Sequence, residues 1–436
     1  MEENQDVVLE SKDLETILKW TLKIPSYQRI YCWKEKTVLK LLNDLCELKE
    51  NEEYCMGNII LQKNTDENGD EYYDIVDGQQ RLVTLSLLIQ VLDEQSAKDI
   101  KLLDQRFENI DAQKFIQYNK FLIENFCGRH KASLRADYIL KDIILNVLIL
   151  KDGSLDLAYT FFSNENSHGK PLTDYDLLKA HHLRYVVYED QQRHLANRWD
   201  ELMKAEKPKN ANYKLYEQAL AIYVFRLRKW LNFDWWDERE KYRVKSEYEA
   251  SPVIEAVPPF CESFKYYEPI QGGTHFFEFT EQAIEKMKYF MMTSEYQMIH
   301  KLDTESFVVL RDVIEALLFA YFYKFGMRYL TEALLLITRY VSQVRYQNRR
   351  IFQSSVFEHV RLSKIPLLIE MYSSPTFFLA KMNDTNSTLM SLQQIKAQEN
   401  RSTISDIRER YNKKLKECFN DINENDLIIK GINEWK

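Results

Sequence analysis

The sequence of 436 residues is longer than one hydrophobic core usually organises, so two or three folded cores are expected. Its hydrophobic content of 45% is sufficient to fill them. The formal net charge of -8 at pH 7 argues against a generally basic nucleic-acid-binding protein. The cysteines lie far apart with no C-x-x-C pair, which argues against a disulfide framework and against a metal site.

Helix breakers are scarce, with 10 glycines and 9 prolines, and this composition is typical of long helices. The most apolar stretch, Phe307–Tyr323, is interrupted by Arg311, Asp312 and Glu315. It therefore predicts a buried helix and not a membrane span. Because the first residues are acidic and polar, unlike a signal peptide, we expect a cytoplasmic protein without a membrane segment.

The first hundred residues predict short helices around a β-hairpin, from apolar spacing and turn residues. In chain order the predicted elements are a helix at 11–22 capped by Ser11, an ordered extended loop IPSYQRIYCW, a helix at 35–50, hairpin strands Cys55–Lys63 and Glu71–Asp77, and a helix from Gln79 to about Leu92.

Beyond residue 100 the pattern predicts amphipathic helices and no convincing strand pair. The segments are 112–126, 138–150, 174–190, 213–231, 276–292, 305–346, 352–372 and 404–418. We therefore predict an α+β fold, predominantly α, with an N-terminal domain at 1–190 and a helical domain at 191–436. Loops at 247–274 and 374–403 would divide the helical part.

The stretch YYDIVDGQQRLVTL, residues 72–85, has two interpretations. Asp77 could cap the following helix, with Gln80 reaching back as a capping-box partner. Alternatively, a strand, a glycine turn and a helix N-terminus form an anion site, in which Gly78 allows close approach and Arg81 adds a charged donor. An arginine in a first helical turn is unfavourable without an anion, which favours the second interpretation.

Two further polar clusters accompany this stretch. IPSYQR places Gln28 and Arg29 on a constrained segment, where Arg29 either meets the same anion, or caps a carbonyl or makes a surface salt bridge. In NENSHGKPLTDYDLLKA, residues 164–180, a polar loop precedes a helix that Thr173 or Asp174 can cap.

These three motifs occur in the order and approximate spacing of the GmrSD restriction family, whose N-terminal domain the chain resembles over about residues 10–190. DGQQR followed by L-x-T-L is the most specific of the three. The resemblance implies a ParB/sulfiredoxin-like nucleotide-binding core with NTPase activity, used in bacterial defence to restrict phage DNA, often modified DNA. The expected ligand is a nucleoside triphosphate, alone or with Mg²⁺.

The resemblance also implies roles for matching residues. The residues expected to act in catalysis are Asp77, Gln79, Gln80 and Arg81. The nucleotide is expected to contact these four residues and also Gly78, Thr84, Gln28 and Arg29. The loop of Pro25, Tyr27, Gln28 and Arg29 is expected to sense the DNA modification. Asn166, Gly169, Leu172 and Lys179 represent the third motif, in which His168 stands where the family more often has Arg. Arg81→Ala is expected to abolish nucleotide binding while leaving the fold intact.

Many members of the family end in an HNH nuclease, yet none of the eight histidines has a convincing HNH context and none follows His359. We therefore expect a partner nuclease or other effector protein. The aromatic run Trp230–Trp236 would form the surface that docks on this partner, unless its rings fill the core. The acid-free segment Arg339–Arg350 is either a DNA contact, through Arg339, Arg345, Arg349 and Arg350, or an ordinary amphipathic helix.

Two functions remain. In the first, the chain is an NTP-hydrolysing sensor of a defence system that licenses an effector acting on DNA. In the second, it is a non-enzymatic nucleotide- or DNA-binding regulator. The sequence leaves its oligomeric state open.

Overall fold

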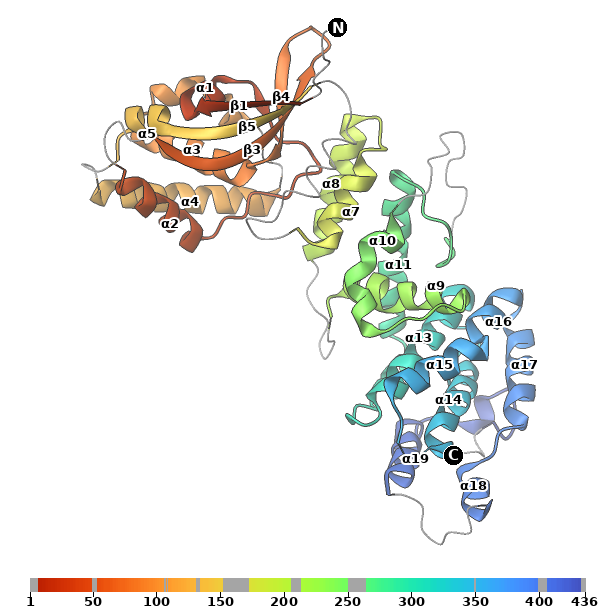
Figure 1. Cartoon of the computed structure of the whole chain (residues 1–436). Helices are drawn as coiled ribbons and strands as arrows, with labels where there is room; N and C mark the ends of the chain where they lie inside the picture. Colours follow the sequence, from red (N-terminus) through yellow and green to blue (C-terminus); the bar gives the residue numbers. More distant parts are fainter. Residues whose placement is uncertain are drawn as a thin grey trace. The chain divides into compact units, whose positions relative to one another are not determined.

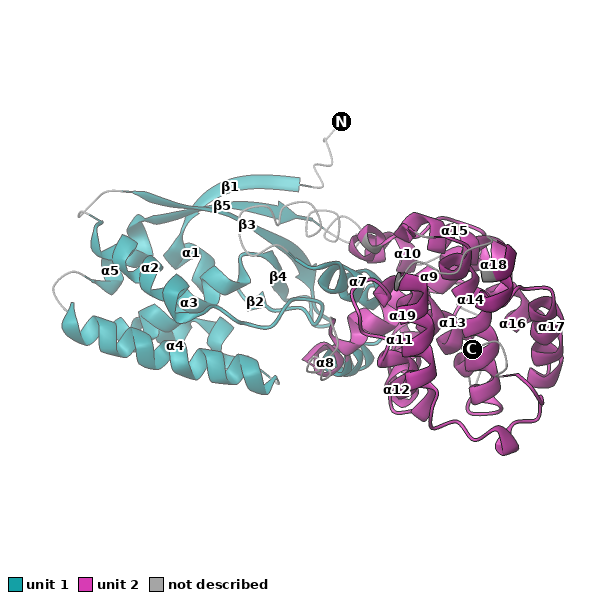
Figure 2. Cartoon of the chain, turned by 90° about the horizontal axis from the view of Figure 1, so that it is seen from below, with its two compact units in different colours: residues 1–198 teal, residues 199–436 magenta. Residues whose placement is uncertain are grey.

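The structure, a computed structural model, describes residues 7–48, 53–105, 107, 109–130, 134–151, 172–204, 213–249, 264–348, 350–398 and 406–432 (Figure 1). The chain forms two compact units, residues 1–198 and residues 199–436, coloured separately in Figure 2. The described residues are mostly helical with one five-stranded sheet, which confirms the predicted class.

The sheet of the first unit has the order β1-β5-β3-β4-β2. β3 and β4 pair antiparallel and form the predicted hairpin, while β5 runs parallel to β3 and antiparallel to β1, and β2 runs parallel to β4. The strands are β1 Val7–Asp13, β2 Leu22–Lys23, β3 Tyr54–Thr65, β4 Glu71–Asp77 and β5 Ile143–Leu150.

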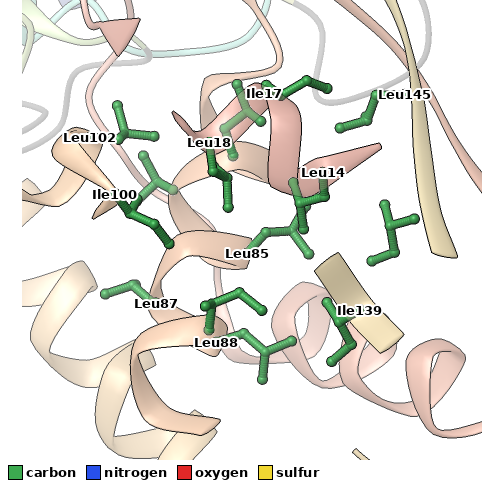
Figure 3. Packing of buried hydrophobic residues seen from close by; sticks show 14 of the residues in the cluster. Leu14, Ile17, Leu18, Leu85, Leu87, Leu88, Ile100, Leu102, Ile139 and Leu145 are labelled. Carbon is green, nitrogen blue, oxygen red and sulfur yellow. The ribbon is translucent and has the colours of Figure 1, made fainter. Parts of the chain in front are cut away.

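One face of this sheet carries the main core of the unit. Side chains from α1, α3, α5 and β5, among them Leu14, Leu85, Ile139 and Leu145, meet there in one cluster (Figure 3). The helices α2 and α4 lie side by side below the same face (Figure 1). The α-helices of this unit are α1 Leu14–Lys19, α2 Glu35–Cys46, α3 Gln79–Leu92, α4 Ile110–Arg129, α5 Ala136–Asp142 and α7 Asp174–Leu183, and α8 Glu189–Lys204 runs across the boundary at residue 198.

The other face of the sheet has a smaller apolar cluster, built from Ile60, Val76 and Leu150 and covered by Ala180 of α7. Tyr27 of the IPSYQR loop packs against the same cluster. The sheet is therefore covered on both sides, and β3 and β4 are fixed between two layers.

Two predictions for the first unit are wrong. Ser11 lies inside β1 and does not cap α1, because Asp13 accepts a hydrogen bond from the Thr16 amide at 2.7 Å. The run IILNVLIL forms strand β5 where a helix was predicted, since an uninterrupted apolar run fits either element. The partners of β5, β1 and β3, both precede residue 100, so no strand pair lies beyond that residue in the described part of the chain.

The second unit is helical throughout its described residues and centres on the hairpin of α13 and α14. α13 Val308–Phe325 corresponds to the predicted buried helix, and Gly326 ends it, so the single segment predicted at 305–346 is two helices. No described helix has the length and apolar character needed to cross a membrane. The remaining described helices are the π-helix η3 Glu217–Val224, α9 Phe225–Leu231, α10 Val244–Tyr248, α11 Thr274–Met291, α12 Ser294–His300, α14 Leu330–Gln347, α15 Gln353–Ser363, α16 Ile365–Met371, α17 Pro375–Ser387, α18 Leu392–Gln398 and α19 Asp406–Cys418, with the short 3-10 helices η4 Glu238–Arg243 and η5 Glu424–Asp426.

Two loops were predicted in this unit, and they have different outcomes. The segment 374–403 contains α17 and α18, so it is not a long loop. Of the predicted division at 247–274, residues 250–263 lie outside the described part of the chain. Trp230 and Trp236 are buried in the core, whereas Phe233 and Trp235 are exposed, so half of the aromatic rings of this run fill the core.

Candidate functional site at the start of α3

The turn between β4 and α3 is made by Gly78. Its φ of 98° lies in the left-handed region, and a Cβ at this position would come within 2.5 Å of Ile59 Cγ2. Only glycine meets both conditions. The strand therefore enters the helix in one residue, and α3 begins at Gln79.

Asp77 does not cap α3, which corrects the capping interpretation. The N-cap residue is Gly78, and no side chain among the described residues bonds to the amides of the first turn. Asp77 instead accepts from Arg81 Nη2 at 3.1 Å. The first turn of α3 thus keeps amide groups without a side-chain acceptor, together with the positive end of the helix dipole.

The Arg81 side chain binds two backbone carbonyls of β3. Its Nη1 donates to the Met56 carbonyl at 3.0 Å and its Nη2 donates to the Asn58 carbonyl and to Asp77. Between Cys55 and Asn58 the pairing of β3 with β5 shifts register, at Gly57. Arg81 therefore holds a bulge in the strand, so we now expect its substitution by alanine to destabilise the fold, whereas the sequence alone led us to expect an intact fold.

Gln80 ties α3 to the IPSYQR loop. Its Oε1 accepts from the Cys32 amide at 2.9 Å, and its Nε2 donates to the Ile30 carbonyl at 3.1 Å. From the loop, Gln28 Nε2 donates to the carbonyls of Ile75 at 2.9 Å and Val76 at 2.6 Å, at the end of β4. The sequence placed these motifs near each other, and the two glutamines supply the physical connection.

A buried hydroxyl chain reinforces this connection. Thr84 Oγ1 donates to the Gln80 carbonyl at 2.8 Å and lies 2.8 Å from the hydroxyl of Tyr31. Asn119 of α4 donates to the same tyrosine hydroxyl at 3.0 Å and to the Trp33 carbonyl at 2.9 Å. Thr84 is fully buried, so it cannot contact a nucleotide as predicted. The roles of Asn119 and Gly57 were not foreseen, since neither belongs to a recognisable motif.

Arg29 and Gln79 are two polar residues of this site whose side chains are not fully paired within the described part of the chain. No described residue makes a hydrogen bond or ion pair with the half-buried Arg29 side chain. Both of its chain neighbours are held in place, because Gln28 donates hydrogen bonds to β4 and the Ile30 carbonyl accepts one from Gln80. Gln79, the first residue of α3, is 5% exposed and its Oε1 has no hydrogen-bond partner among described residues. Arg29 therefore lies on the loop that Gln28 and Gln80 hold against β4 and α3.

The third motif falls partly outside the described residues. Asn166, His168 and Gly169 cannot be placed, whereas Leu172 packs on the second face of the sheet and Lys179 is buried on α7. Thr173 caps α7 in a reciprocal capping box with Asp176, as one of the two predicted caps. This part of the motif docks α7.

The predicted DNA-contacting arginines do not form an exposed basic face. Arg345 is 2% exposed and donates to the Ser306 carbonyl at 3.3 Å, and burial lowers its pKa. Arg339 is half-buried and donates to the Leu389 carbonyl at 3.4 Å. Arg350 is exposed, and Arg349 lies outside the described residues. α14 is a core helix of the second unit.

Comparison with known families decides the class of the first unit. Residues 8–183 match the family described as the GmrSD restriction endonuclease, N-terminal domain. This part of the chain is therefore similar to the N-terminal domain of that restriction family.

The GmrSD-type domain is followed by residues 191–403, which match a family of unknown function (DUF7834). No curated protein matches the chain. The ParB/sulfiredoxin-like relation, nucleotide hydrolysis and DNA binding stay predictions.

Proposed function

We propose that the chain is the nucleotide-responsive component of a restriction or anti-phage system, and that a nucleoside triphosphate binds at the start of α3. The observation that carries this proposal is that an uncapped helix N-terminus and a left-handed Gly78 adjoin the loop of Arg29, whose side chain has no partner among the described residues. Free amides and a helix dipole favour a phosphate group, and an arginine provides charge-assisted donors to it.

In this proposal, fewer residues of the motif contact the nucleotide than the sequence predicts. Gln28, Gln80 and Arg81 are engaged by protein groups and would shape the cradle without touching the nucleotide. Asp77 has one carboxylate oxygen on Arg81, and its other oxygen is the group that could orient Mg²⁺ or a water.

A partner effector and DNA complete the proposal. The family description names a restriction endonuclease, and the histidines of this sequence do not fit the HNH pattern. Nucleotide turnover in the first unit would then license cleavage by a second protein. The alternative, a nucleotide-binding regulator without turnover, is favoured by one observation: most polar side chains of DGQQR are occupied structurally.

Release of inorganic phosphate by the purified chain, with NTP and Mg²⁺ and with or without DNA, separates the two functions. Turnover that Asp77→Asn abolishes, while the exposed Asp70→Asn leaves it unchanged, would support the NTPase. Nucleotide binding without phosphate release under all these conditions would support the regulator. Absence of both binding and release would refute the site itself.

A further inference from the structure

A buried polar cluster lies in the second unit, between the π-helix η3, α12 and α13. Its centre is Glu315, 2% exposed, which accepts hydrogen bonds from the Tyr223 hydroxyl at 2.8 Å and pairs with His300 Nδ1 at 2.9 Å. Arg311 Nε lies 3.6 Å from the same carboxylate. Burying these charged groups costs free energy that an apolar core would not, so fold stability does not explain the cluster.

The cluster lines a cavity of about 40 Å³. By volume it holds roughly three water molecules or one tetrahedral anion, and not a whole nucleotide. Tyr223 and Gln218 reach it from the π-helix, a rare element that recurs at functional sites. Asp312, with 39% of its side chain exposed, lies at the edge of the cavity.

The orientation of His300 suits ligand contact. Its ring is stacked on Tyr296, with centroids 5.0 Å apart, and Nδ1 is held by Glu315. Nε2 has no hydrogen-bond partner among described residues, and the side chain is 25% exposed. A carboxylate that fixes one ring nitrogen presents the other to a ligand in a defined direction.

Charged side chains of both signs line the cavity. The formal charges of Arg226 and Arg311 balance those of Asp312 and Glu315, so His300 is the remaining lining group that can add a positive charge when an anion binds. Because Glu315 holds Nδ1, His300 would meet that anion with its Nε2–H, and Arg311 would meet it from the neighbouring helix α13.

We propose that this cavity binds a phosphate group, held by the His300 imidazolium and Arg311, with Glu315 balancing the imidazolium charge. The ligand is inorganic phosphate or the phosphate end of a small monoester. This site is independent of the nucleotide site proposed for the first unit.

Calorimetry with the full chain tests the proposal, with inorganic phosphate in one experiment and phenyl phosphate in the other, at constant ionic strength. We expect one binding event that His300→Gln weakens by about tenfold or more. His359→Gln is the matched control, because His359 also stacks on a tyrosine in the second unit but lies outside the cavity. Binding of both ligands means that the mouth admits an organic group, and binding of inorganic phosphate alone means that it does not.

A spectroscopic measurement on the unaltered protein covers the case in which the variant does not fold. Nitrogen-15 labelling of histidine should show His300 Nε2 moving to the protonated chemical-shift range when phosphate is added. No binding of either ligand, or binding with unchanged His300 resonances, would overturn the proposal and leave a water-filled polar cluster.

Discussion

The guanidinium of Arg81 lies against Gly57, the residue at which β3 changes its register with β5. Arg81 Nη1 is 3.0 Å from the Met56 carbonyl and would be 3.1 Å from a Cβ at position 57. Gly57 itself has a φ of 88°. Arg81 fits only where position 57 has no side chain, and its hydrogen bonds hold the bulge in place. The DGQQR motif therefore acts first as a structural clamp on β3.

Arg81→Ala should lower the free energy of unfolding by about 2–3 kcal/mol, because carbonyls of the bulge lose their charged donor. Arg81→Lys should restore little of this loss, since an ammonium cannot bridge two carbonyls as a fork does. Chemical denaturation measures both, with the exposed Arg129→Ala as control. Wild-type stability of Arg81→Ala would contradict the clamp.

Gly78→Ala should destabilise the chain more than Gly69→Ala. Both glycines have positive φ, but a Cβ at Gly69 meets nothing within 4 Å, whereas one at Gly78 clashes with Ile59. Backbone strain alone costs about 1–3 kcal/mol, and the clash adds to it. Adding Ile59→Ala to Gly78→Ala should cost less than the two single losses combined. Simple additivity in unfolding experiments would show that the clash is not what matters.

Gln80→Glu should loosen the IPSYQR loop. The substitution keeps an acceptor for the Cys32 amide but replaces the donor to the Ile30 carbonyl with an oxygen. We expect amide hydrogen exchange at Cys32 to accelerate about tenfold, a change of roughly 1–2 kcal/mol in local opening. Gln113→Glu is the control, because its amide bonds to the Phe107 carbonyl outside this loop. Unchanged exchange at Cys32 would rule out the anchoring role.

Asp74 on β4 should make stability depend on pH. Burial raises the pKa of its carboxyl to about 7, and nearby Glu189 adds to this rise while Lys23 and the Asn64 hydrogen bond oppose it. The folded protein therefore keeps the proton up to about pH 7, whereas the unfolded chain releases it near pH 4. Stability relative to Asp74→Asn should fall as the pH rises from about 4 to 7, by roughly 2–4 kcal/mol, and stay level above.

Thermal unfolding of wild type, Asp74→Asn and the exposed Asp70→Asn at several pH values measures this difference. A difference between wild type and Asp74→Asn that does not change with pH would mean that Asp74 titrates as an ordinary surface carboxyl.

The sequence was sufficient to predict the hairpin and the start of α3, because turn residues and leucine spacing act locally. It was misleading for β5, where IILNVLIL lacks the alternation that separates a strand from a buried helix. The clamp made by Gln28, Gln80 and Arg81 could not be predicted, because their partners are backbone carbonyls and amides of segments distant in the chain. Arg345 looked exposed for the same reason, since a charge pattern does not reveal which neighbours cover a helix.

The most direct test of the central claim is the affinity of a nucleoside triphosphate for the wild-type chain and for Arg29→Ala, measured by calorimetry. Arg29 has no described protein partner, so its removal should spare the fold and weaken nucleotide binding by about tenfold to a hundredfold, through loss of a charge-assisted contact. Arg129→Ala, on the surface of α4, should bind like wild type. Equal affinities for wild type and Arg29→Ala, or no nucleotide binding by the wild-type chain, would contradict a phosphate site at the start of α3.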